Sequence, residues 1–346
     1  MTVKGIYIHG VVPNFYGTTQ FQLLEHSGVY AITFQNISAI VSDSESASID
    51  YSDLESLGHA LVHQQETIEE LMGKGFSLII PMRLGTIVNS KEEVLNILSH
   101  GYGLIIDTLK KIEYLTEMEL VVTWAIFNDV LKSIADLPDV KELKNELMNN
   151  NGNITKVDQY KMGLFVQEKL DEKNKAIELI ILDTLSPFGL DIKTHKVRND
   201  EMVTNSAFLI NRNKKEPFEK AIDLLDEAYK GLLNFKLVGP LPCYSFYTLE
   251  VKDLDPDQVE NSTKELGLSS ETTESEIKKA YMVKANPAHT DHGHDSQDPE
   301  YFDRIQNAYH TLLDYSAAAK QLSDNVTISL AKEKISENLM VVKIMD

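Results

Sequence analysis

Alternating and helical runs of apolar residues predict that this chain folds from both strands and helices. Residues 3–9 alternate and predict a strand, and residues 29–34 and 37–41 predict a hairpin that turns at Gln35-Asn36. A helix is expected to begin after Ser52-Asp53, because a short polar side chain can cap the first turn before leucines at helical spacing. We therefore expect the first part of the chain to be an α+β domain.

The middle of the chain follows the order strand, helix, strand, strand, helix, strand. Strands are predicted at residues 118–127, 190–197, 202–210 and 245–251, and helices over 129–148, 156–185 and 217–234. This β-α-β-β-α-β order is the ferredoxin-like arrangement. The predicted fold class is thus α+β, with an N-terminal α+β domain over residues 1–115 and a ferredoxin-like domain over 116–252.

A small helical module is predicted after the acidic linker at residues 253–257. Two amphipathic helices can pack there as an antiparallel pair, which gives a module over 253–322 and a tail over 323–346. The residues that would join the helices are Ile277, Tyr281, Phe302, Ile305, Tyr309 and Leu312. The apolar run 339–345 must be buried, either on a sheet edge of the same chain, which we prefer, or against a partner.

Composition narrows the class of protein. The chain has 346 residues, enough for two or three domains, and a net charge of −20. A surface this acidic repels phosphate backbones and anionic lipids, so neither nucleic acid nor a membrane is an expected partner. The first residues lack the pattern of a signal peptide, and a single cysteine, Cys243, excludes an internal disulfide. We therefore expect a cytoplasmic protein.

The sequence offers no set of residues for catalysis. It has no Gly-x-x-x-x-Gly-Lys-Ser/Thr phosphate loop and no Gly-x-Ser-x-Gly turn. Cys243 has no positive group near it in sequence that would activate its thiol. We expect no enzyme, no catalytic residue and no cofactor.

Two groups of side chains are of types that bind metals. His59, His63, Glu66 and Glu70 share one helix face, where zinc binding competes with polar packing or a partner contact. We prefer polar packing or a partner contact, because no His-Glu-x-x-His core is present. The second group is the loop with His289, Asp291, His292, His294 and Asp295. This loop is also typical of freely solvated segments, and no metal site is predicted.

Two segments carry residues that restrict the backbone. Residues 239–246, Gly-Pro-Leu-Pro-Cys-Tyr-Ser-Phe, hold one glycine and two prolines within four positions. These prolines exclude a regular central strand and predict a stiff, extended entry into the strand 245–251. Residues 81–86, Pro-Met-Arg-Leu-Gly-Thr, follow an apolar strand. Arg83 is expected to form a structural ion pair, with capture of a partner's carboxylate as the alternative.

These segments resemble signatures of the GvpL/GvpF family of gas vesicle proteins. The first resembles Gly-Pro-x-Pro-Pro-Tyr-Ser-Phe, with Cys243 at the second proline of the pair. The second resembles Pro-x-Arg-Phe-Gly-Thr, with Leu84 for the phenylalanine, and residues 207–210 resemble an Ala-Phe-Leu-Val strand. All three occur in the order found in the family, so the chain is identified by resemblance as a member over residues 3–251.

The resemblance implies a function in gas vesicle organization. Members are cytoplasmic assembly factors, chaperone-like in role, that bind the hydrophobic shell protein and other accessory proteins. It also implies two α+β domains, of which the second is ferredoxin-like. A minor structural component of the finished vesicle is an alternative. The candidate partner contacts are Pro81, Arg83, Gly85, Thr86, Pro240, Tyr244 and Phe246. For Pro240 and Pro242, a corner that defines the fold is the preferred interpretation.

Residues 259–315 resemble a J-domain, the module with which DnaJ-type co-chaperones engage Hsp70. His289-Thr290-Asp291 stands where J-domains have His-Pro-Asp, so the proline that stiffens this loop is missing. The helix before it has only a small surplus of lysine over glutamate. A J-type co-chaperone that recruits Hsp70 to shell subunits through His289 and Asp291 is therefore the second hypothesis. The other hypothesis is a J-like fold that is reused as a docking module or is merely inherited.

Overall fold

The computed structural model describes most of the chain as two compact units. The described residues are 5–14, 28–45, 53–149, 155–285, 299–322, 327–335 and 339–345. The first unit combines residues 1–111 with 247–346, and the second spans residues 112–246. Each unit has its own core and is described by itself.

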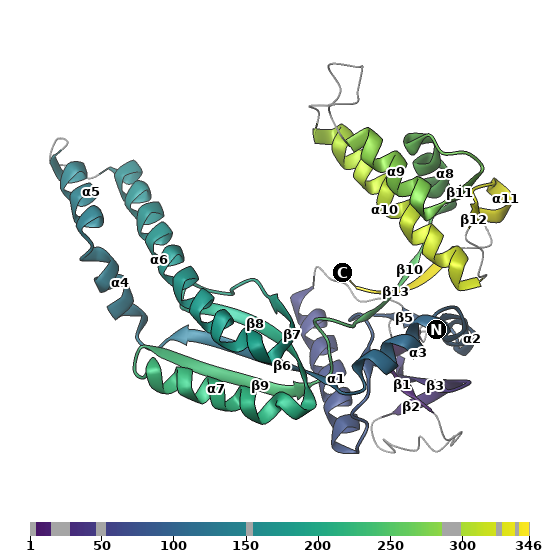
Figure 1. Ribbon diagram of the computed structural model, residues 1–346, viewed down its shortest axis with the longest axis horizontal. Helices are drawn as coiled ribbons and strands as arrows, with labels where there is room; N and C mark the ends of the chain where they lie inside the picture. Colours follow the sequence, from purple (N-terminus) through teal and green to yellow (C-terminus); the bar gives the residue numbers. More distant parts are fainter. Residues whose placement is uncertain are drawn as a thin grey trace. The chain divides into compact units, whose positions relative to one another are not determined.

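The N-terminal part of the first unit is a five-stranded antiparallel sheet (Figure 1). Its strands are β1 (Gly5–Pro13), β2 (Val29–Phe34), β3 (Ile37–Ser44), β4 (Ile80–Pro81) and β5 (Ile87–Val88). The order is β2-β3-β1-β4, with β5 also paired to β1. The predicted hairpin between β2 and β3 is confirmed, with Gln35 at a positive φ of 50° in its turn.

Three helices accompany this sheet. They are α1 (Leu54–Gly73), α2 (Lys91–His100) and α3 (Tyr102–Ile112). Asp53 caps α1 as expected, because its carboxylate accepts a hydrogen bond from the backbone N–H of Glu55. Ile68 and Leu71 of α1 are buried, and so are Ile105 and Leu109 of α3. The second half of α1 and helix α3 therefore face a core, whereas Leu61 in the predicted stripe of α1 is 55% exposed.

The C-terminal part of the first unit contains the helical module. Its elements are β10 (Leu249–Asp253), α8 (Pro256–Leu266), β11 (Glu271–Thr273), α9 (Glu274–Ala285), α10 (Pro299–Leu322), β12 (Thr327–Ser329), α11 (Lys332–Ile335) and β13 (Met340–Ile344). Ile277 of α9 meets Ile305 and Leu312 of α10 in one core, and the rings of Tyr281 and Tyr309 stack 4.3 Å apart. Phe302 was expected on this face, but 46% of its surface is exposed at the start of α10.

The apolar tail is buried within the chain. Strand β13 pairs antiparallel with β10, from Leu249 opposite Ile344 to Asp253 opposite Met340. Val341 and Val342 are fully buried. The expectation of burial on a sheet edge of the same chain is confirmed.

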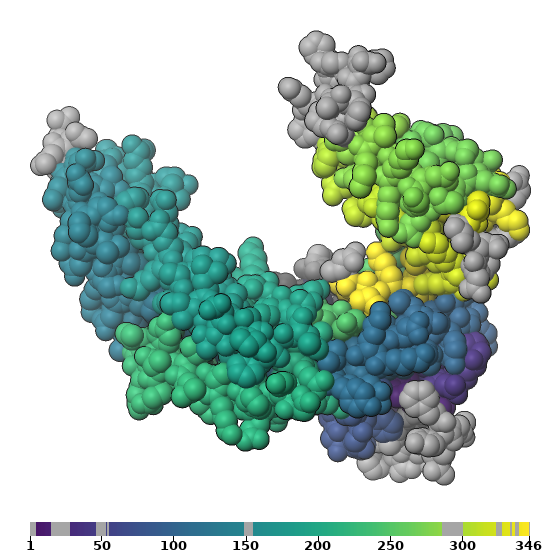
Figure 2. All heavy atoms as spheres, viewed as in Figure 1, coloured from purple at the N-terminus to yellow at the C-terminus, as the bar shows by residue number. Residues whose placement is uncertain are grey.

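The second unit has the predicted ferredoxin-like topology. Its elements are β6 (Leu115–Trp124), α4 (Phe127–Ala135), α5 (Pro138–Asn149), α6 (Lys156–Leu185), β7 (Gly189–Thr194), β8 (Met202–Asn211), α7 (Lys215–Ala228) and β9 (Leu233–Leu241). The antiparallel sheet has the order β7-β8-β6-β9. Phe208 on β8, Ile181 on α6 and Phe218 on α7 belong to one buried cluster. The first half of α6 extends beyond the sheet together with α4 and α5 (Figures 1 and 2).

The fourth strand of this sheet differs from the prediction. It is β9, residues 233–241, and the predicted strand 245–251 is replaced by a turn followed by β10. Gly231, with φ of 76°, separates α7 from β9, so Leu233 begins a strand rather than ending a helix. Among the described strands, β9 pairs only with β6, so it is an edge strand of the sheet. Pro240 lacks a backbone N–H, and an edge strand tolerates this because one of its sides has no neighbouring strand.

Gly101 provides a test of how the tail packs. A Cβ atom built on Gly101, between α2 and α3, would lie 2.8 Å from Cγ1 of Val342. We expect Gly101→Ala to lower the free energy of unfolding by about 1–3 kcal/mol, because β13 must move to make room. Urea unfolding measures this loss, and Val342→Ala in the same chain should recover part of it.

Gly103→Ala is the matched control, because nothing lies within 4 Å of a Cβ atom at that position of α3. It should raise stability by about 0.5–1 kcal/mol through helix propensity alone. Equal stabilities for the two alanine variants would contradict the close packing of Val342 on Gly101.

Candidate functional site

The first signature segment, residues 81–86, forms a turn between β4 and β5. Gly85 has φ of 83°, a conformation that favours glycine. Its N–H donates to the hydroxyl of Tyr7 at 3.2 Å, and the Thr86 hydroxyl donates to the carbonyl of Arg83 at 2.7 Å. Pro81 is buried opposite Gly10 on β1. The turn is hydrogen-bonded within itself and to β1, and it fixes one corner of the sheet.

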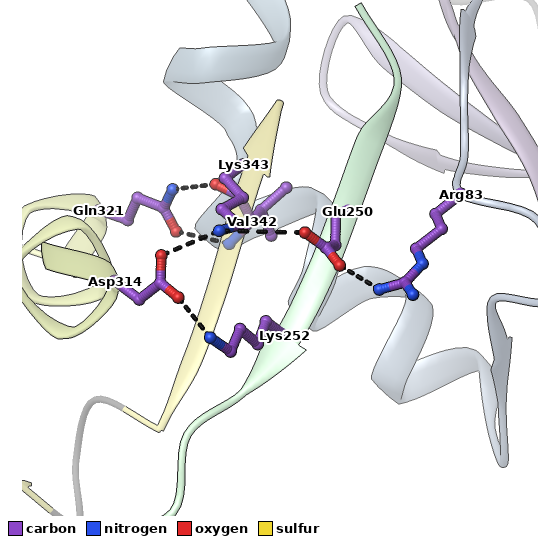
Figure 3. A network of polar contacts seen from close by, with 7 residues as sticks. All are labelled: Arg83, Glu250, Lys252, Asp314, Gln321, Val342 and Lys343. Carbon is purple, nitrogen blue, oxygen red and sulfur yellow. Dashed lines mark hydrogen bonds and ion pairs between the residues drawn. The ribbon is translucent and has the colours of Figure 1, made fainter. Parts of the chain in front are cut away.

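Arg83 links this turn to the C-terminal part of the same unit (Figure 3). Its guanidinium Nη1 pairs with the Glu250 carboxylate on β10, and its backbone N–H donates to the Leu249 carbonyl at 2.7 Å. The Arg83 side chain is 50% exposed, whereas that of Glu250 is 15% exposed. The expected structural ion pair is therefore present, and its arginine side chain is partly exposed to solvent.

The ion pairs continue across the module. Lys343 on β13 lies 3.9 Å from Glu250 and 3.0 Å from Asp314 on α10, and Lys252 lies 2.6 Å from Asp314 (Figure 3). Burial raises the pKa of Asp314, but hydrogen bonds from Lys252 and Lys343 outweigh this effect and lower it below its ordinary value. Ion pairs between side chains of α10, β10 and β13 therefore connect these three elements.

The second signature segment, residues 239–246, makes a bulge and a tight turn. Gly239 and Pro240 together oppose Met118 on β6, because the register shifts between Glu117 and Glu119. Gly239 has φ of 144°, and a Cβ atom there would lie 2.7 Å from the Met118 sulfur. Only glycine fits this approach, so the segment defines a corner of the fold.

A buried glutamate lies beneath that turn. Glu117 on β6 is fully buried and accepts hydrogen bonds from the backbone N–H and the hydroxyl of Ser245, both at 2.8 Å. The His195 ring lies 3.2 Å from the same hydroxyl. Burial raises the pKa of Glu117 from 4.5 to about 7, although the Ser245 hydrogen bonds oppose this shift. The sequence did not single out Glu117, because the residues on either side of it in β6 do not show that its side chain is buried.

Cys243 lies beside this glutamate. It is 2% exposed, and burial, with the Glu117 charge, raises the pKa of its thiol to about 12. A thiol in this state is a poor nucleophile, as the sequence indicated.

A second polar cluster lies between β1, β3 and α1. His9 is fully buried with its Nε2 atom 2.9 Å from the Ser42 hydroxyl, and its ring centre is 5.0 Å from that of His63. Burial, then His63, lowers the pKa of His9 to about 3. The hydroxyl of Tyr7 donates to Gln64 at 2.6 Å. His63 therefore takes part in polar packing, which is one of the two preferred interpretations given above.

His59, another member of the helix face considered for zinc, points away from this cluster. His59 lies 4.0 Å from Glu55 on the exposed side of α1. Within the described ranges, no three His, Cys, Asp or Glu side chains are placed to hold a metal ion. The loop group at residues 289–295 lies outside those ranges.

The other predicted contacts differ in accessibility. Pro240 is exposed, Tyr244 is half-buried and Phe246 is 7% exposed. His289 and Asp291 lie outside the described residues. The structure brings Pro81, Arg83, Gly85 and Thr86 together in one turn, and their role as partner contacts stays a prediction.

Two of the three lysines of α9 are hydrogen-bonded within the module. Lys278 donates to Glu274 at 2.6 Å, and Lys320 of α10 donates to the other oxygen of Glu274 at 2.5 Å. Lys284 donates to the carbonyl of Glu265. Hydrogen bonds from Lys278 and Lys320 lower the pKa of Glu274 to about 2. Two of the three lysines expected to form a basic face, Lys278 and Lys284, therefore have internal partners.

Taken together, these features define an α+β protein whose second unit is ferredoxin-like and whose C-terminal module is helical. The model of a family described as gas vesicle synthesis protein GvpL/GvpF matches residues 5–248, more than half of the chain. The chain belongs to this family. The model of the DnaJ domain matches residues 264–320, outside the first match.

Individual relatives agree with this family. Gas vesicle protein F of Dolichospermum flosaquae is 20% identical over 71% of this chain and 98% of its own length. Gas vesicle protein F of Haloferax mediterranei is 19% identical over 64% of this chain and 83% of its own. The crystal structure of GvpF from Anabaena sp. PCC7120 has a TM-score of 0.56 at 19% identity, over 70% of this chain and 97% of that one. At such identity the likeness shows the fold alone.

A helix that spans a membrane needs about 20 consecutive, mainly apolar residues. None of the described helices is both long enough and apolar enough to cross a bilayer.

Glu117 predicts a pH dependence of stability. Its pKa is raised in the folded state, so its contribution is complete below pH 4.5 and is lost as the pH rises through about 7. Glu117→Gln removes this loss. We expect the stability of the variant relative to wild type to rise by on the order of 3 kcal/mol between pH 4 and pH 8, as measured by urea unfolding.

Glu113→Gln is the matched control, because Glu113 is exposed just before the same strand. Its stability relative to wild type should stay nearly constant over this range. A flat difference for Glu117→Gln as well would show that Glu117 titrates alike in the folded and unfolded chains.

Proposed function

We propose that this protein is an accessory factor of gas vesicle assembly that binds the hydrophobic shell protein and other accessory proteins. Membership of the GvpL/GvpF family over residues 5–248 is the observation that carries the proposal. The net charge of −20 supports it, since an acidic carrier keeps a complex with an apolar subunit dispersed. The protein would act in the cytoplasm and at the gas vesicle.

The two signature turns support a binding role rather than catalysis. Their polar groups are hydrogen-bonded within the turns and to adjacent strands, and the thiol of Cys243 is buried and protonated. They set the shape of the two units, on which partner surfaces can be displayed.

Co-expression with the shell protein tests this proposal. Affinity-tagged full chain should keep shell protein in the soluble fraction and retain it on the resin, because contact with the carrier covers apolar surface. The control is an unrelated tagged protein of similar size and net charge, which should retain none. Shell protein that remains insoluble beside the full chain would count against the proposal.

The DnaJ match at residues 264–320 favours a second candidate, a co-chaperone that recruits Hsp70 to shell subunits. The internal pairing of Lys278 and Lys284 argues against it, since a basic helix face would be needed for that contact. So does Thr290, which leaves the loop without its proline.

Hsp70 ATPase assays separate the two candidates. We expect the full chain to leave the ATPase rate at its basal value, because Lys278 and Lys284 of α9 are already hydrogen-bonded within the module. The recruiting hypothesis requires stimulation that His289→Ala abolishes and that His292→Ala, in the same loop, leaves intact. That pattern would favour Hsp70 recruitment over the proposed function of binding the shell protein directly.

A further inference from the structure

A groove of about 590 Å³ lies between α4, α5 and α6 of the second unit. Its walls are mainly apolar, and they include Leu131, Val140, Leu147, Met162, Val166 and Leu170. These helices form the part of the unit that extends beyond the sheet (Figures 1 and 2). The groove is separate from both signature turns.

Gly163 lines this groove in the interior of α6. Glycine within a helix costs about 1 kcal/mol relative to alanine, and nothing lies within 4 Å of a Cβ atom at this position. Packing within the chain therefore does not require glycine here. Its absent side chain instead lets another element approach α6 closely.

Two charged residues on the lining have no ion pair with any described residue. Lys144 lies in the second half of α5, and Asp200 lies next to Met202, which pairs with Thr123 at the end of β6. They therefore mark opposite ends of the groove. A third charged residue, Asp158, is engaged in the capping box of α6, where it accepts from the Thr155 backbone N–H at 3.0 Å.

We infer that the groove receives an amphipathic helix of a partner protein, which would pack as a further helix beside α4, α5 and α6. Its α6 wall runs from Gln159 to Leu170, which corresponds to about three turns of helix. The partner helix would lay apolar residues at i, i+3, i+4 and i+7 against the groove. A carboxylate on it would meet Lys144 and a cation would meet Asp200.

The lining favours a helix over a small ligand. Small-molecule sites have a few polar groups that converge on one point, whereas Lys144 and Asp200 are at opposite ends of an apolar surface. Two antiparallel helices with apolar ridges leave a natural seat for a third. The choice of the shell protein as the probe rests on the proposed function.

The variant Gly163→Leu places a large side chain in the groove and also stabilises helix α6. Leucine has a high helix propensity, so the thermal unfolding temperature should be unchanged or higher. Retention of co-expressed shell protein should nevertheless fall at least tenfold, because the side chain occupies the seat of the partner helix. Gly58→Leu is the matched control, since Gly58 is also exposed inside a helix with nothing within 4 Å of its Cβ position. It should gain stability and keep wild-type retention.

Photocrosslinking identifies the occupant independently of retention. A benzoylphenylalanine at Gln159, on the groove, should crosslink in cells that express the gas vesicle genes, and one at Glu168, on the opposite side of α6, should not. Peptide mapping should place the Gln159 crosslink in an amphipathic helical segment of a gas vesicle protein.

The outcomes separate this inference from the proposed function. Wild-type retention by Gly163→Leu would overturn the groove and leave shell-protein binding standing. If the wild-type chain retains no shell protein, the proposed function is wrong. In that case a crosslink from Gln159 to a helix of another gas vesicle protein would still support the groove as a binding site for a partner helix. A crosslink to a second copy of this chain, or none to any other chain, overturns it.

Discussion

The antiparallel pairing of β10 with β13 is the interaction on which the first unit depends. Strand β10 alone would expose one edge, and β13 alone would expose Val341 and Val342. Paired, they bury both valines and place Lys252 and Lys343 on either side of Asp314. Since Arg83 meets Glu250 on the other edge of β10, one short ladder joins the N-terminal sheet to the helical module. Each ion pair contributes modestly, and the backbone pairing aligns them all.

The signature turns illustrate a second constraint, which is that special backbone positions dictate residue type. Gly85 and Gly239 both have positive φ, and a side chain at Gly239 would also collide with the sulfur of Met118. Glu117 then supplies acceptors for a turn that would otherwise bury the N–H and hydroxyl of Ser245 without partners. Residues that identify the family in sequence are thus residues that the fold requires at its corners.

The sequence predicted those parts of the fold that local patterns encode. The first hairpin, the cap of α1 and the strand order of the ferredoxin-like unit follow from alternation, short polar residues and helical stripes. The prediction was wrong at β9, because Leu232 and Leu233 have the spacing that would continue the helical stripe of α7. In the structure α7 ends at Ala228, and Gly231, with its positive φ, separates the helix from β9. The candidate turns could be found by resemblance. Glu117, His9 and the groove could not, because burial and the meeting of α5 with α6 are tertiary properties.

The helical module shows why a domain match alone does not define a function. Its lysines are hydrogen-bonded within the module, since the Glu274 carboxylate accepts from Lys278 and Lys320, and the backbone carbonyl of Glu265 accepts from Lys284. A recruiting surface would need these cations free, and releasing Lys278 or Lys320 would break a pairing that lowers the pKa of Glu274 to about 2. The same module is fastened through Asp314 and β13 to the strand beside Arg83. These charges serve cohesion, so the module is built as a fixed part of its unit.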